Sequence, residues 1–131
     1  MFVDTSGFYS LYNGDQTYHQ TAVAHYDAAI RRITTNYVLA EYVALSDARG
    51  SSRKDAIDFS LRVLDDGEID LIWVDEALHR KAVQLLIERD DKTYSLCDSV
   101  AFVIMREQGI TDALTTDKHF FQEGFVRLLE S

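Results

Sequence analysis

The chain has 131 residues, a formal net charge of −9 and an apolar fraction of 47%. This length and composition are those of one ordinary globular domain, so we expect a single domain covering residues 1–131 rather than a disordered chain. A protein that coats nucleic-acid phosphates with lysine and arginine should be basic, and the acidic balance excludes that mode for the surface as a whole. The one cysteine excludes an intramolecular disulfide and a zinc site built from several cysteines.

The same features indicate where the chain resides. No apolar run approaches the length of a bilayer-spanning helix, so no membrane association is expected. The first residues include Asp4 and no lysine or arginine, unlike the start of a secretory signal. A single thiol fits a reducing compartment. We therefore expect a cytoplasmic protein.

Short apolar runs alternate along the chain with helical periodicity. In chain order, the pattern predicts a strand at 1–3, a helix at 15–30 capped by Asp15, a strand at 32–35, helices at 36–48 and 52–64, a strand at 69–74, helices at 75–88 and 96–107, and strands at 113–116 and 126–129. Strands that alternate with helices form parallel sheets covered on both faces. We therefore predict an α/β fold, a three-layer α/β/α sandwich with a short, mostly parallel central sheet.

Acidic side chains follow several of these strands. Asp4 comes directly after the first strand, and Asp117 comes directly after the strand at 113–116. Glu41 and Asp98 lie in the first two turns of helices that begin near strand ends. Parallel sheets place their functional sites beyond the carboxyl ends of the strands, so these four carboxylates are candidates for one shared pocket.

Helix capping is the alternative explanation for most of these acids. Asp4, Asp117 and Asp75 each precede a predicted or possible helix, and aspartate is among the best N-cap residues. Ser95 followed by Asp98 resembles a capping box with aspartate in place of glutamate. Taken singly, each of these residues is better explained as a cap than as a catalyst.

Glu41 is different because it lies in the almost uninterrupted apolar run at 37–45. A carboxylate there is expected to be partly buried, and a buried charge must be paired, metal-bound or neutralised. The structural alternative to a functional role is an ion pair with Arg31 or Arg32.

The four acids are more informative as a set. Two carboxylates about 4 Å apart repel by roughly 4 kcal/mol at an effective dielectric constant near 20. This is a large part of a domain's usual stability of about 5–15 kcal/mol. A hard divalent cation such as Mg²⁺ or Mn²⁺ removes that penalty and activates water for hydrolysis. Helix N-termini at the same edge offset the repulsion and favour an incoming phosphate.

Four stretches carry a resemblance that covers essentially the whole chain. They are FVDTSGFYSLYN at 2–13, ITTNYVLAEYVAL at 33–45, YSLCDSVAFVIMREQGI at 94–110 and ALTTDKHFFQEGFVRL at 113–128. In this order and spacing, the chain resembles the PIN-domain family of metal-dependent ribonucleases, and within it the VapC-like toxin branch.

The resemblance implies roles for particular residues. Asp4, Glu41, Asp98 and Asp117 would hold one or two Mg²⁺ or Mn²⁺ ions, with Asp4 and Asp98 as direct ligands. Polar groups that orient these carboxylates would be Ser6, Asn36 and Thr116. The implied reaction is hydrolysis of RNA phosphodiester bonds at the four-carboxylate site. The implied partners are RNA as substrate, a cognate antitoxin protein and a second copy of the chain in a homodimer.

Other functions remain open at this point. The same fold serves in RNA-processing nucleases without an antitoxin, or in a non-catalytic module that binds RNA or protein. A phosphoacceptor signalling domain is also an α/β fold with an acidic pocket, and here Asp75 would be its phosphorylated residue. Two neighbours of the acids are interpreted first in structural terms: Cys97 as a small core residue, and His119 as part of the start of a short helix, with contact to RNA as its functional alternative.

Overall fold

The computed structural model describes residues 1–130. Its strands are β1 (Phe2–Val3), β2 (Arg32–Thr35), β3 (Ile69–Ile72), β4 (Asp112–Leu114) and β5 (Val126–Arg127). Its helices are α1 (Thr5–Tyr12), α2 (His19–Ala28), α3 (Asn36–Ala48), α4 (Arg53–Asp65), α5 (Glu76–Glu88), α6 (Leu96–Gln108) and α7 (Lys118–Gln122).

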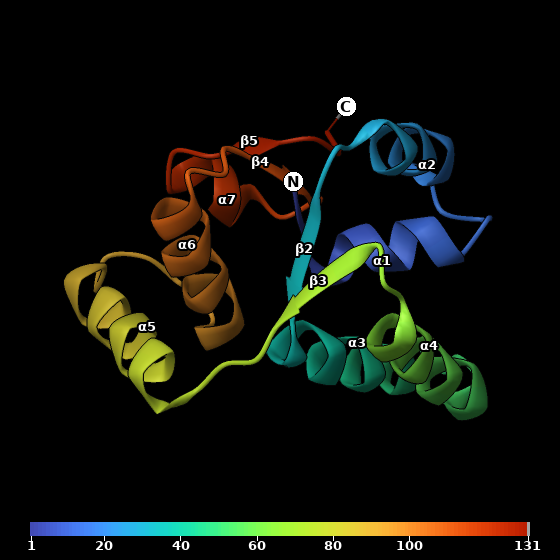
Figure 1. Cartoon of the computed structure of the whole chain (residues 1–131), viewed down its shortest axis with the longest axis horizontal. Coiled ribbons are helices and arrows are strands. Elements are labelled where there is room, and N and C mark those ends of the chain that lie inside the picture. Colours follow the sequence, from blue (N-terminus) through green and yellow to red (C-terminus); the bar gives the residue numbers. More distant parts are fainter. Residues whose placement is uncertain (131) are drawn as a thin grey trace.

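The strands within residues 1–130 form one sheet in the order β3-β2-β1-β4-β5, and every pair of neighbours is parallel. Figure 1 shows α1 to α4 on one side of this sheet and α5 to α7 on the other. The predicted α/β sandwich is therefore confirmed, with a fully parallel sheet. Because the strands are parallel, Val3 lies beside Leu114 and Thr35 beside Ile72 at one edge, and the segments that follow all start from that edge.

The elements differ from the predictions mainly near the N-terminus. Helix α1 was not predicted, because its sequence TSGFYSLY is rich in residues of modest helix propensity. Helix α2 begins at His19 instead of residue 15, so Asp15 does not cap it. Instead, residues 13–18 turn, and the His19 ring Nδ1 lies 2.8 Å from the carbonyl oxygen of Ser10.

The strand predicted at 69–74 ends earlier, at Ile72. The backbone N–H of Val74 donates to the Asn36 side chain at 2.7 Å. This bond ties the segment after β3 to the first residue of α3, and the chain leaves the sheet there.

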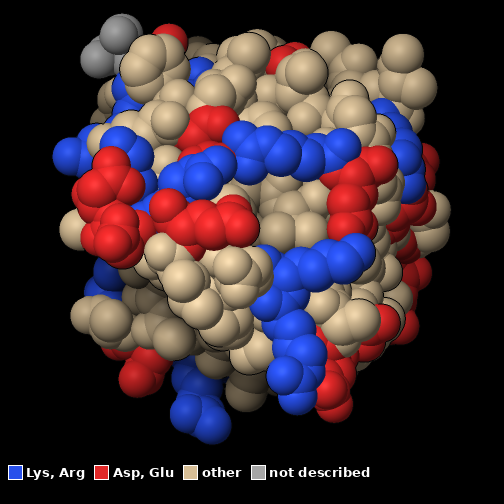
Figure 2. Space-filling model, turned by 90° about the vertical axis from the view of Figure 1, so that its left-hand side faces the viewer, with Lys and Arg blue, Asp and Glu red and all other residues tan. Residues whose placement is uncertain are grey.

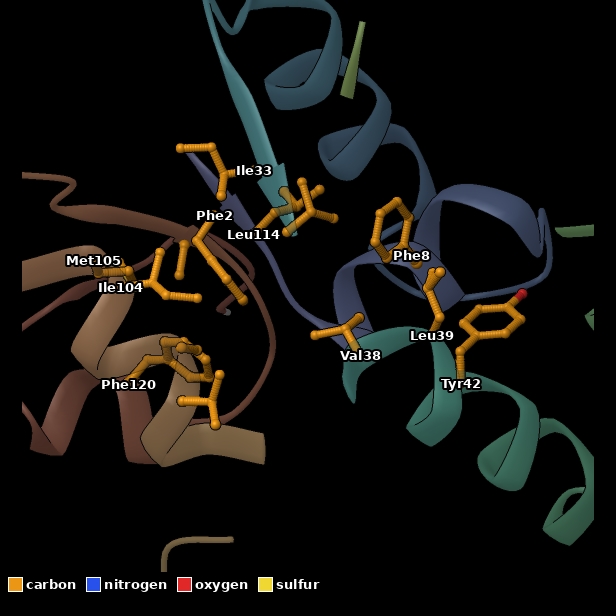
Figure 3. Packing of buried hydrophobic residues seen from close by; sticks show 14 of the residues in the cluster. Phe2, Phe8, Ile33, Val38, Leu39, Tyr42, Ile104, Met105, Leu114 and Phe120 are labelled. Atoms are coloured by element: carbon orange, nitrogen blue, oxygen red, sulfur yellow. The ribbon is translucent and has the colours of Figure 1, made fainter. Parts of the chain in front are cut away.

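The core lies on both faces of the sheet (Figure 3). Phe2, fully buried in β1, points toward Ile104 and Phe120 of the α6–α7 side. On the other face, Leu114 of β4 points toward Phe8 of α1. Alternating side chains along a strand point to opposite faces, so even these very short strands contribute to both halves of the core.

Gly7 allows α1 to pack directly on β4. A Cβ atom at this position would overlap the backbone carbonyl of Leu114. The close contact holds the start of α1, and with it Asp4, against the carboxyl end of the sheet. None of the helices within residues 1–130 combines the length and apolar character needed to cross a membrane.

Candidate active site

Four carboxylates from four parts of the chain meet at the carboxyl edge of the sheet. Ligand atoms of Asp4, Glu41 and Cys97 lie within 4.8 Å of one another, and so do those of Asp98, Asp117 and His119. The two groups are linked electrostatically, because the charges of Asp98 and Glu41 both act on Asp4. We call Asp4, Glu41, Asp98 and Asp117 the acidic centre.

Asp4 is the most buried member, with 4% of its surface exposed. Burial, followed by repulsion from Asp98 and Glu41, raises its pKa to about 8. The Thr115 hydroxyl, which donates to Asp4 Oδ2 at 2.9 Å, opposes this rise. Asp4 occupies the N-cap position of α1, as predicted, but among the described residues its side chain accepts no capping hydrogen bond, so capping does not account for its carboxylate.

Asp98 and Asp117 cap helices and also belong to the acidic centre. Ser95 and Asp98 form the predicted capping box at the start of α6. Asp117 accepts the N–H of His119 at 2.8 Å at the start of α7. Burial, followed by the charge of Asp117, raises the pKa of Asp98. Capping therefore fixes where these two carboxylates lie, and it does not exclude a function for them.

Glu41 is partly buried, as its apolar surroundings predicted. Within residues 1–130, no lysine, arginine or histidine nitrogen lies within 4.0 Å of its carboxylate. Arg31 pairs with Asp70 at 2.7 Å. Arg32 donates to the carbonyl oxygen of Tyr26 at 2.9 Å. The structural alternative of an arginine partner is therefore wrong, and Glu41 faces Asp4 and Cys97.

A chain of hydroxyl groups supports Asp4. Thr115 donates to Asp4, lies 3.1 Å from the Ser6 hydroxyl oxygen, and accepts the N–H of Asp117 at 3.0 Å. Ser6 in turn accepts the N–H of Thr116 at 2.9 Å. The threonine hydroxyl that reaches Asp4 is thus that of Thr115, one residue before the Thr116 that the resemblance indicated.

Asn36 lies apart from this chain. Its side chain binds the segment after β3, as described above, and it holds the N-terminal end of α3 in place. Thr35 caps the same helix by accepting the N–H of Val38 at 3.2 Å. These bonds orient the helix that carries Glu41 instead of contacting the carboxylate itself.

The site contains two residues, His119 and Cys97, for which the sequence favoured structural interpretations. His119 places Nδ1 2.9 Å from Asp98 Oδ2 and 3.4 Å from Asp117 Oδ1, and Nε2 lies 3.2 Å from the Thr93 hydroxyl. Cys97 packs partly on the core, but its sulfur also faces Asp4 and Glu41, and burial raises the pKa of this thiol. The sequence signal that could have identified them as site residues is their position: Cys97 directly precedes Asp98, and His119 lies two residues after Asp117.

Asp75 is not part of the acidic centre. It is exposed and caps α5 by accepting the N–H of Leu78 at 2.9 Å. It belongs to neither group of clustered ligand atoms found within residues 1–130. The structure thus supports its interpretation as a helix cap.

The fold and the acidic centre together define a class: an α/β protein whose parallel sheet gathers carboxylates into a site suited to a divalent cation. The chain belongs to the PIN domain family, which residues 1–125 match. This confirms the family indicated by the four sequence stretches.

A relative in Mycobacterium tuberculosis, the 23S rRNA-specific endonuclease VapC20, is 30% identical over 129 residues, which cover 98% of this chain and 97% of the relative. The crystal structure of Mycobacterium tuberculosis VapC20, described as a sarcin–ricin loop cleaving toxin, superimposes with a TM-score of 0.86. That comparison covers 95% of each chain at 30% identity. The chain is thus similar to VapC toxins over almost its whole length.

Proposed function

We propose that this protein is a divalent-metal-dependent endoribonuclease and the toxin of a toxin–antitoxin pair. The observation that carries the proposal is the convergence of Asp4, Glu41, Asp98 and Asp117 at the carboxyl edge of a PIN-domain sheet. The similarity to VapC20 supports RNA as the substrate class, and 23S rRNA is the first substrate to test. The unit proposed to carry the activity is residues 1–131 as one domain.

The residues of the acidic centre fit a hard cation. Carboxylate oxygens are the ligands that Mg²⁺ and Mn²⁺ prefer, and a bound divalent cation offsets the mutual repulsion of such groups. Burial is the main cause of the raised pKa of Asp4 and of Asp98, and repulsion from neighbouring carboxylates adds to it. Asp4 and Asp98 would hold the ion directly, with Glu41 and Asp117 binding directly or through water. When bound, the ion would act as a Lewis acid that lowers the pKa of a water molecule and offsets negative charge on the phosphate oxygens.

The remaining polar groups orient the carboxylates. Thr115, whose hydroxyl also contacts that of Ser6, holds one oxygen of Asp4 in place, so the other oxygen keeps a defined direction. His119 holds Asp98 Oδ2 while the capping box anchors the same carboxylate to the N-terminal end of α6. Such outer contacts preorganise a site before substrate and ion arrive.

The face of the molecule shown in Figure 2 offers RNA no broad basic surface. On the face that carries α5, lysine and arginine side chains are interspersed with aspartate and glutamate (Figure 2). Arg80 pairs with Glu76 and Lys81 pairs with Glu107, both on exposed positions of α5 and its neighbour α6. The bound cation and a few local cations therefore carry the attraction for phosphate.

The oligomeric state, the location and the protein partner are inferred from the similarity to VapC toxins. We propose a cytoplasmic homodimer that a cognate antitoxin protein inhibits. Size-exclusion chromatography with light scattering tests the dimer, and co-expression with the product of a neighbouring gene tests the antitoxin. A chain that cleaves RNA without arresting growth would instead be an RNA-processing nuclease.

The direct test is cleavage of RNA by purified protein. We expect 23S rRNA within total RNA to be cut with Mn²⁺ or Mg²⁺ and to stay intact with EDTA. Asp4→Asn and Asp98→Asn should each lower the rate by at least about a hundredfold, because each removes a charged ligand of the ion. Expression of the parent should arrest growth, and expression of either variant should not.

Asp75→Asn is the matched control. It makes the same chemical change at an exposed helix cap, and asparagine caps helices as well as aspartate does. This variant should cleave RNA at the parental rate. Equal activity of Asp4→Asn and the parent would refute the acidic centre as the catalytic site, and cleavage that persists in EDTA would refute the metal dependence.

A further inference from the structure

A polar hollow of about 220 Å³ lies beside the acidic centre. Its lining includes Ser6, Tyr9, Gln16, Tyr18, Arg49 and Thr116. Ser6 and Thr116 are also part of the hydroxyl chain that reaches Asp4 through Thr115. The hollow and the acidic centre therefore share a wall.

Arg49 is the one cation in the lining of this hollow. Its guanidinium lies 4.5 Å from the centroid of the Tyr9 ring, at the C-terminal end of α3. Stacking on an aromatic ring leaves the in-plane N–H groups of a guanidinium available for a bidentate anion. The position is exposed, so an anion in solvent can reach it.

Arg49 is also unusual among the cations of this acidic chain. Of its 13 lysines and arginines, eight form ion pairs with carboxylates within residues 1–130. Arg49 pairs with none in that part of the chain, although carboxylates outnumber cations 22 to 13. A guanidinium that stacks on Tyr9 and pairs with no carboxylate in the described part of the chain keeps its charge available for a ligand.

We propose that this hollow is a nucleotide subsite, in which Arg49 binds a backbone phosphate of RNA next to the phosphodiester that is cut. Tyr18, partly exposed in the same lining, offers a ring on which a base can stack, and Gln16 offers an amide for a base edge. The inference rests on the proposed function, because it places the hollow along the path of an RNA strand that enters the acidic centre.

The test compares charge removal at two stacked arginines. Arg62 is the matched control: it lies 5.6 Å from the Tyr12 ring centroid and has no carboxylate partner within residues 1–130. It lines a different hollow, whose lining includes neither Ser6 nor Thr116, the residues that link the Arg49 hollow to Asp4. Steady-state cleavage of a labelled hairpin with the sarcin–ricin loop sequence is measured in Mn²⁺ for the parent, Arg49→Gln, Arg49→Lys and Arg62→Gln. Thermal unfolding shows that each variant is folded.

We expect Arg49→Gln to raise KM about fivefold to tenfold and to change kcat less than about twofold, because the lost contact binds substrate and transition state alike. The slope of log(kcat/KM) against log[KCl], measured between about 50 and 200 mM KCl, should become less steep by about one, because one phosphate contact is lost. Arg49→Lys should recover part of the affinity, and Arg62→Gln should match the parent.

Two results would overturn the proposal in different ways. If the parent cleaves the hairpin and Arg49→Gln keeps its KM and salt dependence, the subsite is refuted while the nuclease function stands. The subsite is refuted in the same way if Arg49→Gln weakens only the binding of a partner protein and leaves RNA cleavage unchanged. If the parent cleaves no RNA with any metal, the proposed function fails, and the subsite fails with it.

Discussion

Asp4→Asn in metal-free protein gives the sharpest test of the electrostatics of the acidic centre. Asp4 is preferable to Asp98, whose carboxylate also closes a capping box and binds His119. Asparagine keeps an oxygen that can accept the Thr115 hydroxyl, so the substitution chiefly removes the charge. We expect the variant to unfold less readily than the parent at neutral pH when EDTA is present.

The size of the effect follows from the pKa of Asp4, which rises from 3.8 to about 8 in the folded protein. A carboxyl group with a raised folded pKa stabilises the fold at low pH, and this stability is lost as pH rises through the folded pKa. The parent should therefore lose roughly 0.5 kcal/mol by about pH 4, roughly 4 kcal/mol by about pH 7 and roughly 5 kcal/mol by about pH 8. Asn does not titrate, so the advantage of the variant should grow over the same range.

Urea unfolding of both proteins in EDTA, from about pH 4 to about pH 8, measures this difference. Asp27→Asn, at an exposed position of α2, is the control that changes net charge equally. The reasoning is refuted if the difference in unfolding free energy between Asp4→Asn and the parent does not widen with pH, or if the variant is less stable than the parent at about pH 8. Mn²⁺ should stabilise the parent and not Asp4→Asn, which reverses their order.

Three further substitutions test the surroundings of the site by thermal unfolding and RNA cleavage. Thr115→Val should destabilise the fold by about 1–3 kcal/mol and lower the cleavage rate, because Asp4 loses its buried hydrogen-bond donor. Thr115→Ser keeps the hydroxyl and should therefore keep both the stability and the cleavage rate. Equal losses in the two variants would argue against a role for the hydroxyl. Gly7→Ala should cost about 1–3 kcal/mol or more, since its methyl group would overlap the carbonyl of Leu114; a neutral result would contradict the close packing. Glu123→Gln should cost about 2 kcal/mol at neutral pH, because this buried carboxylate, whose pKa two arginines lower, loses its charge. That loss should shrink as pH falls below 4.5, because the unfolded chain's Glu123 is protonated first, and it should disappear once pH has fallen through the lowered folded pKa and the native carboxylate is protonated too. A difference in stability that stays constant down to low pH would contradict the ion pairs.

Much of the fold could be predicted from the sequence because its signals are local. Short β-branched and apolar runs marked the strands, and helical periodicity with a good cap marked α3, α5 and α6. Helix α1 carries no such signal. It forms because Gly7 allows close packing on β4 and Phe8 is buried in the core, which are tertiary contacts.

The acids of the site could also be found from the sequence, because strand ends of a parallel sheet share one edge. Their individual roles could not. Asp4 was open to interpretation as a helix cap, and Glu41 as the partner of Arg31 or Arg32, until the structure showed which groups each one faces. Thr115 and Thr116 are adjacent and identical in type, and only the direction of each side chain at the end of β4 decides which hydroxyl reaches Asp4.

The sequence by itself thus determined most of the order of elements, apart from α1, together with the α/β class and the four carboxylates, since these depend on periodicity and on residues next to strand ends. The tertiary structure decided the partners: His119 with Asp98, Thr115 with Asp4, and the hollow beside Arg49. Such partners come from segments far apart in the chain. Their distances and burial, which set each pKa and each hydrogen bond, exist only once the sheet has brought those segments to one edge.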